Sequence, residues 1–490
     1  MILRDLIKDI IPLKITGRLD KDIKKIVYDS RQAEQDSLFI CIEGFRFDGH
    51  DFIAKAVENG ASAVLVEKDM ADIIEGITYI KVQDTRTAMA GLAASFYDYP
   101  LKKIDLIGIT RTNGKTTTTY LVKNMMDNIG RSTALIGTIK NIIGDRAFPA
   151  TRTTPESLDL YELYSKMLAG NIYQVVMEVS SHALDLKRVS GMEFKAAVFT
   201  NITQDHLDYH KSFEEYINAK CRLFRQLKSD GYAVINLDDP NSGRFIKSSR
   251  GRVITYAVNK EADLKVENII LTSQGVSFEV RGLLNLHLDM KITGLFNVYN
   301  TLAAAGCAYA CGLNEEEIKK GLESVRGVDG RFETIEMGQD FSVIVDYAHT
   351  PDGMENVLKT ALELVEGRLI TVFGCGGDRD KGKRPEMGRI AAKYSDFIVL
   401  TSDNPRSEEP MAIIGDIEAG IKGRKTAYDI IPDRREAIFS AVKRARKGDL
   451  IIILGKGHES YQIFKDKTIP FDDRETAREA IESILGDGNR

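Results

Sequence analysis

A lysine among threonines follows a short apolar segment in a pattern that suits phosphate binding. The segment IDLIGIT is a run of β-branched and apolar residues, which is typical of a buried strand. RTNGKTT (residues 111–117) comes next and leads into a helical pattern. Lys115 can reach terminal phosphates, and Thr116 can place a hydroxyl on Mg²⁺. Ile109 stands where the strict phosphate-loop pattern has its first glycine, so the strand–loop–helix context carries this prediction. A plain βα turn is the alternative.

Two more polar clusters follow predicted strands. MEVSSHALD (177–185) offers Glu178, Ser180 and His182, and TNITQDHLDYH (200–210) offers Asn201, Asp205, His206, Asp208 and His210. If these strands are neighbours of the first, the three strand ends converge on one nucleotide–Mg²⁺ site. A carboxylate and an imidazole there can hold a second metal ion. A single histidine of this kind is more often structural, so the prediction depends on the whole cluster.

The C-terminal third carries four polar loops at predicted strand ends. They are DYAHTPD (346–352), GCGGDRDKGKRP (374–385), SDNPRSEEP (402–410) and GKGHESYQ (455–462). Each alone is compatible with ordinary turn chemistry. Together they indicate a ligand site, because open α/β sheets bind ligands at the carboxyl ends of their strands. Arginine forks bind carboxylates and acidic groups bind ammonium, so the mixture suits an amino-acid substrate.

The elements that must position these loops predict an α/β protein of three domains. Residues 1–101 mix short strands and helices in a small α/β domain. Residues 102–327 predict a P-loop-type ATPase domain with a mostly parallel sheet, followed by antiparallel hairpins over 254–290. Residues 328–490 alternate strand and helix as in a Rossmann-like, doubly wound domain. A length of 490 residues agrees with this division at roughly 150 residues per domain.

Composition excludes several classes of function. Lys and Arg total 67 against 72 Asp and Glu, which disfavours a general nucleic-acid binder. No apolar run approaches the ~20 residues of a membrane span, and charges interrupt the apolar start, unlike in a signal peptide. The five cysteines include no CxxC pair, which favours reduced thiols and a cytoplasmic location.

The strings TNGKTT, TTPES, MEVSSHAL, TNITQDHLDYH, DYAHTPD, GCGGDRDKGKRP, DNPR and GKGHE together resemble the Mur ligases over essentially the whole chain. The resemblance implies an ATP- and Mg²⁺-dependent, monomeric ligase of cytoplasmic peptidoglycan synthesis, and hence of cell-wall biogenesis, cell shape and cell division. It implies that meso-diaminopimelate joins the D-Glu γ-carboxylate of UDP-MurNAc-L-Ala-D-Glu through an acyl phosphate. In this family an Arg in DNPR goes with diaminopimelate, whose distal carboxylate it can clamp and which L-lysine lacks.

Four alternatives remain open. They are the same ligase adding L-lysine, a ligase of the folylpolyglutamate synthetase type, a P-loop phosphotransferase, and a non-catalytic nucleotide-binding relative.

The resemblance also implies roles for individual residues. Contacts to the uridine nucleotide and muramoyl peptide would be Ser30, Phe45, Arg46, Phe47, Thr153, Thr154, Ser180 and Arg188. Contacts to ATP would be Arg111, Thr112, Asn113, Gly114, Lys115, Thr116, Thr117, Asn297, Asn300, Arg331, Asp346 and His349. The diaminopimelate pocket would comprise Arg379, Asp403, Asn404, Pro405, Arg406, Gly455 and Glu459. The catalytic residues would be Lys115, Lys220, His206 and Glu178, and the metal ligands Thr116, Glu178, His206 and Lys220, the last as a carbamate (N6-carboxylysine).

Two of these residues depart from what the pattern or the family suggests. By pattern, Lys220 is a solvated lysine on an amphipathic helix, and its role comes from the resemblance alone. Arg111 stands where family loops carry glycine in TGTNGKTT. If that glycine needs a positive φ, Arg111 is strained, and its side chain is expected to swing toward phosphate or solvent. The attacking amine also needs a base, for which His206, His349 and Asp346 are candidates.

Overall fold

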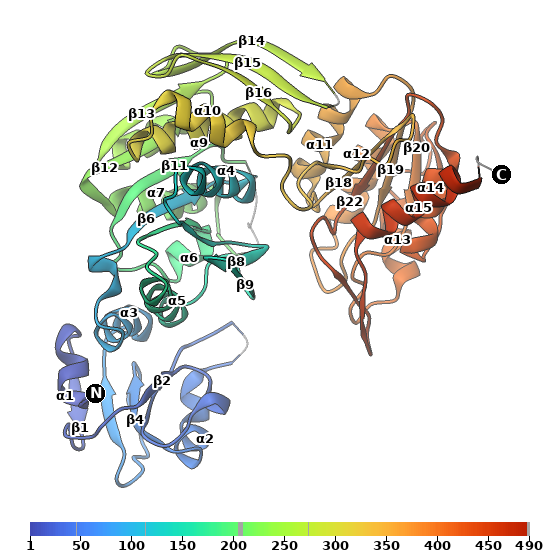
Figure 1. Ribbon diagram of the computed structural model, residues 1–490. Helices are drawn as coiled ribbons and strands as arrows, with labels where there is room; N and C mark the ends of the chain where they lie inside the picture. Colours follow the sequence, from blue (N-terminus) through green and yellow to red (C-terminus); the bar gives the residue numbers. More distant parts are fainter. Residues whose placement is uncertain (46, 113, 204–208, 273, 488–490) are drawn as a thin grey trace. The chain divides into compact units, whose positions relative to one another are not determined.

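The computed structural model describes residues 1–45, 47–112, 114–203, 209–272 and 274–487, which form two compact units (Figure 1). The first unit comprises residues 1–111, 129–235 and 239–254, and the second comprises 112–128, 236–238 and 255–490. The predicted site residues Arg46, Asn113 and His206 lie outside the described residues, as do Asp205 and Asp208. The domain boundaries after residues 101 and 327 stay predictions.

A five-stranded sheet forms the N-terminal part of the first unit. Its order is β1-β5-β4-β3-β2, with β1 antiparallel to β5 and the other pairs parallel. The strands are β1 (Lys14–Thr16), β2 (Lys25–Val27), β3 (Ser37–Ile40), β4 (Ala61–Val66) and β5 (Thr78–Lys81). The α-helices are α1 (Leu3–Leu6), α2 (Ile53–Glu58) and α3 (Thr85–Phe96), with 3₁₀ turns η1 (Ile7–Asp9), η2 (Ser30–Gln32), η3 (Gly49–Phe52) and η4 (Pro100–Lys102). This confirms the small α/β layer that the sequence predicts.

A second sheet of the first unit carries the strand ends of interest. Seven strands follow the order β12-β11-β6-β10-β7-β8-β9, and β6, β7, β10, β11 and β12 are parallel, as predicted. The bounds are β6 (Asp105–Thr110), β7 (Ala134–Ile136), β8 (Lys140–Ile143), β9 (Arg146–Pro149), β10 (Gln174–Glu178), β11 (Phe194–Phe199) and β12 (Leu227–Asn236). The helices are α5 (Ser157–Ala169), α6 (Ser181–Asp185), α7 (Phe213–Arg225) and α8 (Ser242–Ser248). The antiparallel hairpin β8–β9 was not predicted.

Close packing of α7 against β6 places Lys220. A Cβ at Gly108 in β6 would lie 2.9 Å from side-chain atoms of Leu223 in α7 and of Phe194 in β11. Glycine therefore allows the helix to approach the strand, and Lys220, in the same helix, is carried into the protein interior.

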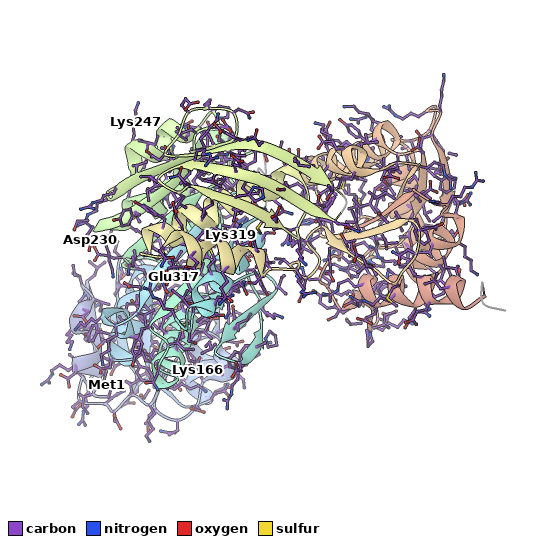
Figure 2. The ribbon with its side chains drawn as sticks, turned by 45° about the horizontal axis from the view of Figure 1, so that its top comes forward. Met1, Lys166, Asp230, Lys247, Glu317 and Lys319 are labelled. Atoms are coloured by element: carbon purple, nitrogen blue, oxygen red, sulfur yellow. The ribbon has the colours of Figure 1, made fainter. Side chains whose placement is uncertain are left out.

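The second unit begins with the helix after the phosphate loop. Helix α4 (Lys115–Asn128) packs on α9 (Leu295–Ala310) and α10 (Glu315–Glu323). Helix α10 begins with a capping box between Asn314 and Glu317. Figure 2 labels Glu317 and Lys319 of this helix. Strands β14 (Leu264–Thr272), β15 (Gly275–Gly282) and β16 (Leu286–Met290) form the predicted antiparallel hairpins. Strand β13 (Arg252–Ala257) is instead parallel to β14, through Tyr256 and Ala257.

The C-terminal sheet of the second unit has the order β17-β18-β22-β19-β20-β21, and only β17 is antiparallel. Its strands are β17 (Glu333–Thr334), β18 (Ser342–Asp346), β19 (Leu369–Phe373), β20 (Phe397–Leu400), β21 (Ala427–Ile430) and β22 (Leu450–Leu454). Alternate strand residues pack on α11 (Pro351–Leu364), α12 (Lys383–Tyr394) and α13 (Pro410–Glu418) on one face, and on α14 (Arg434–Arg444) and α15 (Asp473–Asp487) on the other (Figure 1). The doubly wound prediction is confirmed.

Four elements of this sheet region were not predicted. They are β21 with its following helix α14, and the hairpin of β23 (Tyr461–Ile463) and β24 (Thr468–Pro470). None of the residues of β21 is fully buried, so the strand lacks the apolar run that marks β18, β19 and β22. Among the helices of the described residues, none has both the length and the apolar character that crossing a membrane requires.

Candidate active site

Three neighbouring strands of the first unit deliver their carboxyl ends to one place. The order β11-β6-β10 and its parallel register set Glu178 opposite Ile109, and Phe199 opposite Thr110. Arg111 follows β6 and Thr200 follows β11. A hydrogen bond of 2.8 Å joins them, from Arg111 NH1 to Thr200 Oγ1. The predicted convergence of these strand ends is therefore present.

Glu178 is a buried carboxylate, and Thr138 donates to both of its oxygens. The amide of Thr138 donates to Oε1 at 3.0 Å, and the Thr138 hydroxyl donates to Oε2 at 2.9 Å. A Cβ at Gly137 would lie only 2.6 Å from Oε1, so glycine makes room for the carboxylate. Both oxygens are fixed in direction, which suits a residue predicted to bind a hard cation.

Three of the predicted muramoyl-peptide residues are linked by hydrogen bonds to Glu178, through its backbone carbonyl or through Thr138. The hydroxyl of Thr154 donates to the Glu178 carbonyl at 2.9 Å and accepts from the amide of Ser180 at 3.1 Å. Thr153 lies 3.1 Å from the Thr138 hydroxyl, whose proton goes to Glu178, so Thr153 is the donor. Thr153, Thr154 and Ser180 thus form one hydrogen-bonded group with Glu178.

Glu156, in the string TTPES, organises the arginines beside this group. It is buried and accepts from Arg86 NH1 at 2.9 Å, while Arg188 Nε lies 3.0 Å from its Oε1. Arg152 NH1 also donates to it. Arg188 in turn donates to the Thr154 carbonyl at 2.9 Å. The sequence prediction included Arg188 but missed Glu156, although that residue stands inside a quoted motif.

Removing this carboxylate should destabilise the protein. Glu156→Ala leaves three guanidinium groups without their common anion, and breaking a buried ion pair on one side typically costs about 3–5 kcal/mol. We expect the free energy of unfolding in urea to fall by at least about 3 kcal/mol. Glu162→Ala is the matched control, because Glu162 makes an exposed pair with Lys166 on α5. Equal stability of the two variants would contradict the organising role of Glu156.

Arg111 and Lys220 are both buried, and this corrects two expectations. The φ angle of Arg111 is not positive, so the expected backbone strain is absent. Its side chain is 0% exposed and does not swing toward solvent. Lys220 is likewise buried rather than solvated, because α7 turns it toward β6, and its Nζ donates to the Arg111 carbonyl at 2.9 Å. The ammonium also lies 4.6 Å from the centre of the Tyr216 ring.

Glycine at position 111 should be tolerated in the reaction. Lys220 binds the carbonyl of Arg111, which glycine also provides, so Arg111→Gly should leave turnover per folded molecule within about tenfold, or ~1.4 kcal/mol in barrier. A phosphate-release assay, normalised to folded protein by circular dichroism, measures this. A gain of several hundredfold would instead show that the arginine impairs the loop.

The predicted uridine-nucleotide residues lie in the N-terminal part of the first unit. Phe45 and Phe47 are 77% and 71% exposed, which is unusual for large apolar side chains. The ring of Phe45 lies edge-on to Tyr209 at 5.6 Å. Ser30 is buried, and its carbonyl accepts from Asn59. The two exposed rings provide stacking surfaces for a planar base.

The phosphate-loop residues of the second unit meet a residue from far along the chain. Arg331 NH2 donates to the Thr116 hydroxyl at 3.0 Å, and Lys115 Nζ donates to the Thr112 carbonyl at 3.1 Å. Gly114 has a φ of 88°, which L side chains rarely adopt. Thr117 is buried at the start of α4. Asn297 and Asn300 are buried in α9, where Asn300 donates to Asn297 at 2.8 Å.

Asp346 shapes the loop that carries Arg331 and His349. Its two oxygens accept from the amides of Phe332 and Ala348, each at 2.7 Å. Burial raises the pKa of Asp346, against the opposing charge of Arg331. His349 Nδ1 donates to the Tyr347 carbonyl at 2.9 Å. The pKa of His349 is lowered, first by the protein atoms that crowd the ring and then by Lys383, although much of the residue is exposed.

The four C-terminal loops come together as predicted. They follow β18, β22, β19 and β20, which are consecutive in the sheet. A Cβ at Gly376 would lie 2.8 Å from Arg406 NH1 and 3.8 Å from Arg379 Cγ, so both arginines lie beside this glycine. Arg406 NH1 donates to the Gly377 carbonyl at 2.8 Å. Glu408 accepts instead from Arg384 NH2 at 2.8 Å and lies 3.3 Å from Lys381 Nζ.

The remaining residues of the predicted amino-acid pocket form a compact group. The side-chain Nδ2 of Asn404 donates to Glu459 Oε2 at 2.8 Å. The backbone N–H of Asn404 donates to Asp403 Oδ1 at 2.6 Å. Gly455 has a φ of 114°, and a Cβ there would lie 2.7 Å from Asp403 Oδ2. Pro405 is buried.

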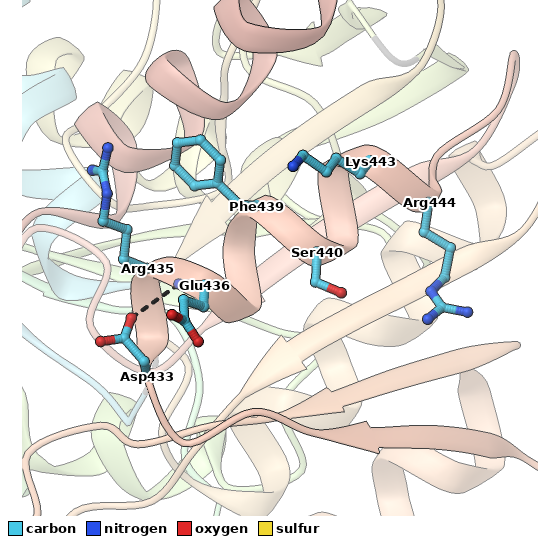
Figure 3. A pocket seen from close by; sticks show the side chains of 7 residues that line it. All are labelled: Asp433, Arg435, Glu436, Phe439, Ser440, Lys443 and Arg444. Atoms are coloured by element: carbon cyan, nitrogen blue, oxygen red, sulfur yellow. Dashed lines mark hydrogen bonds between the residues drawn. The ribbon is translucent and has the colours of Figure 1, made fainter.

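Two cavities of the second unit lie outside these groups. One of about 800 Å³ is lined by side chains of α14 and its N-cap Asp433 (Figure 3). Another of about 820 Å³ includes Ser402, Gln462 and Asp472. Neither lining contains a predicted site residue. All five cysteines are buried, and none forms a disulfide.

The arrangement of strand ends and loops agrees with that of a known family. The Mur ligase middle domain matches residues 109–308, the Mur ligase glutamate ligase domain matches 330–457, and the catalytic domain of the Mur ligase family matches 22–97. The chain belongs to the Mur ligase family, and its α/β architecture of three such domains is confirmed.

Particular relatives cover the whole chain. A UDP-N-acetylmuramoyl-L-alanyl-D-glutamate--2,6-diaminopimelate ligase of Caldanaerobacter subterraneus subsp. tengcongensis is 48% identical over 98% of this chain and 99% of its own length. The first such ligase of Clostridium acetobutylicum is 49% identical over 99% of this chain and its full length. A solved structure of a ligase with the same name shares 31% identity at a TM-score of 0.70, covering 99% of both chains.

Proposed function

We propose that this protein is an ATP-dependent ligase that adds meso-diaminopimelate to the D-Glu γ-carboxylate of UDP-MurNAc-L-Ala-D-Glu, in cytoplasmic peptidoglycan synthesis. The names of its full-length relatives support this reaction. The observation that carries the choice of amino acid is the placement of Arg379 and Arg406 beside Gly376. These two arginines, together with Glu459 in a neighbouring loop, suit an amino acid that bears a second carboxylate and a second ammonium.

The reaction proceeds through two displacements. An oxygen of the γ-carboxylate attacks the terminal phosphorus of ATP, the bond to ADP breaks, and an acyl phosphate forms. The amine nitrogen of diaminopimelate then attacks the acyl carbon, the amide forms, and phosphate leaves with the bond electrons. Lys115 neutralises charge on the phosphates during the first step. Exclusion of water from the site would limit hydrolysis of the acyl phosphate.

Magnesium fits the oxygen donors of the chain. Thr116 would hold one ion beside the phosphates, and Glu178, His206 and the carboxylated Lys220 would hold a second. Within the described residues, no group of three or more His, Cys, Asp or Glu side chains forms a ready-made metal site. Phosphate oxygens and water would complete the ligand set of each ion. When bound, magnesium offsets the negative charge of the phosphates.

The described candidates for the base differ in how they are engaged. Both carboxylate oxygens of Asp346 accept hydrogen bonds from backbone amides. Asp346 therefore supports the loop and is poorly placed to take a proton. His349 donates through Nδ1 and keeps a basic Nε2, and its lowered pKa favours the neutral ring. We therefore assign the removal of the amine proton to His349 in preference to Asp346.

A single assay separates this proposal from its alternatives. Phosphate release is measured with ATP, UDP-MurNAc-L-Ala-D-Glu and either meso-diaminopimelate or L-lysine, and with each component left out in turn. The proposal requires release that depends on the dipeptide substrate and on diaminopimelate. Preference for lysine would identify the lysine-adding ligase. ADP formation without an amide product would identify a phosphotransferase, and no turnover would favour a non-catalytic relative.

A further inference from the structure

Lys456 is a buried cation with no role so far. It lies in the loop after β22, between Gly455 and Gly457, and its side chain is 0% exposed. Its Nζ donates to Asn404 Oδ1 at 3.1 Å and to Glu459 Oε2 at 3.0 Å. Lysine is almost never fully buried unless it is paired, because removing an ammonium from water is costly. The two bonds satisfy that requirement at one particular place, the predicted amino-acid pocket.

The bonds of Lys456 fix the direction of the Asn404 amide. Asn404 Oδ1 accepts from Lys456 and also from the amide of Ile463 at 2.9 Å, which occupies both of its lone pairs. Nδ2 of the same side chain donates to Glu459 Oε2 at 2.8 Å. The oxygen of Asn404 therefore faces the protein, and this side chain supports the pocket instead of offering its carbonyl to a ligand.

The same bonds orient the carboxylate of Glu459. Its Oε2 accepts from both Lys456 and Asn404, whereas neither of these bonds uses Oε1. Glu459 is 16% exposed, so Lys456 turns one oxygen inward while part of the carboxylate remains accessible. A carboxylate held in this way can accept a hydrogen bond from an ammonium group without first being reorganised.

The network extends to the arginine on the other side of the pocket. Ile463, whose amide binds Asn404, accepts through its carbonyl from the amide of Arg406 at 3.0 Å. Arg406 has a φ of 53°, a strained conformation that persists only where surrounding bonds hold it. One chain of hydrogen bonds thus runs from Lys456 through Asn404 and Ile463 to Arg406.

We propose that Lys456 is a positioning residue that presents Glu459 to an ammonium group of the amino-acid substrate and steadies the backbone of Arg406. The inference rests on the proposed function, since it assigns a role within the amino-acid pocket. A purely structural buried ion pair is the competing explanation. Such an ion pair would affect folding and would change the KM values of all three substrates alike.

The test is Lys456→Met, which keeps the length of the side chain and removes its charge and hydrogen bonds. We expect the KM for meso-diaminopimelate to rise at least about tenfold, equivalent to 1.4 kcal/mol. The KM values for ATP and for the UDP-dipeptide should change by less than about twofold. Lys465→Met is the control, because Lys465 is exposed in the same hairpin region. An unchanged KM for diaminopimelate, or equal losses for all three substrates, would overturn the proposal.

A second comparison tests whether Lys456 acts through Glu459. Glu459→Gln removes the charge that Lys456 orients, so adding Lys456→Met to it should raise the KM for diaminopimelate by no more than about twofold further. A full additive rise in the double variant would overturn the positioning role. Both comparisons use variants measured against the active wild-type enzyme. Lack of diaminopimelate-dependent phosphate release in the wild type would refute the proposed function itself.

Discussion

Lys220→Ala should nearly abolish turnover, and small carboxylic acids should partly restore it. We expect the rate of phosphate release to fall at least about a thousandfold, or ~4 kcal/mol in barrier. This expectation rests on the proposal that Lys220 is carboxylated. Its ammonium first loses a proton, the free amine nitrogen bonds to the carbon of CO₂, and a second proton leaves the nitrogen, so that a cation becomes a carbamate anion whose oxygens suit Mg²⁺.

The burial of Lys220 supports this expectation. The side chain is 1% exposed, and its Nζ donates to the Arg111 carbonyl in the loop that follows β6. A solvated surface lysine would point away from the site, whereas this interior one reaches the loop that follows β6. Acetate or bicarbonate, added to Lys220→Ala, should fill the space left by the side chain and supply the missing oxygens.

The control is Lys166→Ala on the surface of α5 (Figure 2). Lys166 pairs with Glu162 in an exposed i,i+4 geometry, worth only about 0.3–0.5 kcal/mol. Its loss should leave turnover unchanged. Full activity of Lys220→Ala would refute the carboxylate role, and so would a loss that no carboxylic acid restores while the protein remains folded.

Arg406→Ala should lower kcat/KM for meso-diaminopimelate by at least about 30-fold and leave a weak activity with L-lysine nearly unchanged. The two amino acids differ by the carboxylate at the far end of the side chain. Loss of a buried, charge-assisted pair typically costs about 2–5 kcal/mol, which sets the size of the effect. L-lysine has no distal carboxylate for Arg406 to pair with, so removal of the guanidinium should cost little with lysine bound.

The surroundings of Arg406 favour this role over a surface ion pair. Among the described residues, no ion pair joins Arg406 to Glu408 or Glu409, because Glu408 is engaged by Arg384 and Lys381. NH1 of Arg406 donates to the Gly377 carbonyl, and this bond aims the guanidinium into the loop that also carries Arg379. An exposed pair would be worth only about 0–1 kcal/mol and would not discriminate between substrates.

Initial rates measured with each amino acid test this effect directly. Initial rates with diaminopimelate and lysine are compared for the wild type, Arg406→Ala and the control Arg389→Ala, whose arginine is exposed on α12. The control should retain the wild-type preference. Equal losses of Arg406→Ala for both amino acids, or no loss for either, would contradict a selective role.

Much of the fold and many site residues could be predicted from the sequence, for local reasons. Consecutive apolar residues mark β6, β18, β19 and β22 as buried strands, and the polar residues that follow them mark the carboxyl end of each sheet. Glycine and proline in DNPR and GKGHE mark tight loops. Strand β21 lacks such an apolar run and was missed, and the hairpins β8–β9 and β23–β24 are short.

The sequence alone determined that this protein is an α/β ligase-type chain with phosphate-binding and arginine-rich loops, because these signals lie within a few residues of one another. Only the tertiary structure decided which side chains meet. Burial of Lys220 and Arg111 follows from how α7 packs on β6, and the bonds of Glu156 and Lys456 follow from the order of elements far apart in the chain. Periodicity indicates which face of an element is apolar. It does not indicate which other element covers that face, because the order of strands far apart in the chain decides this.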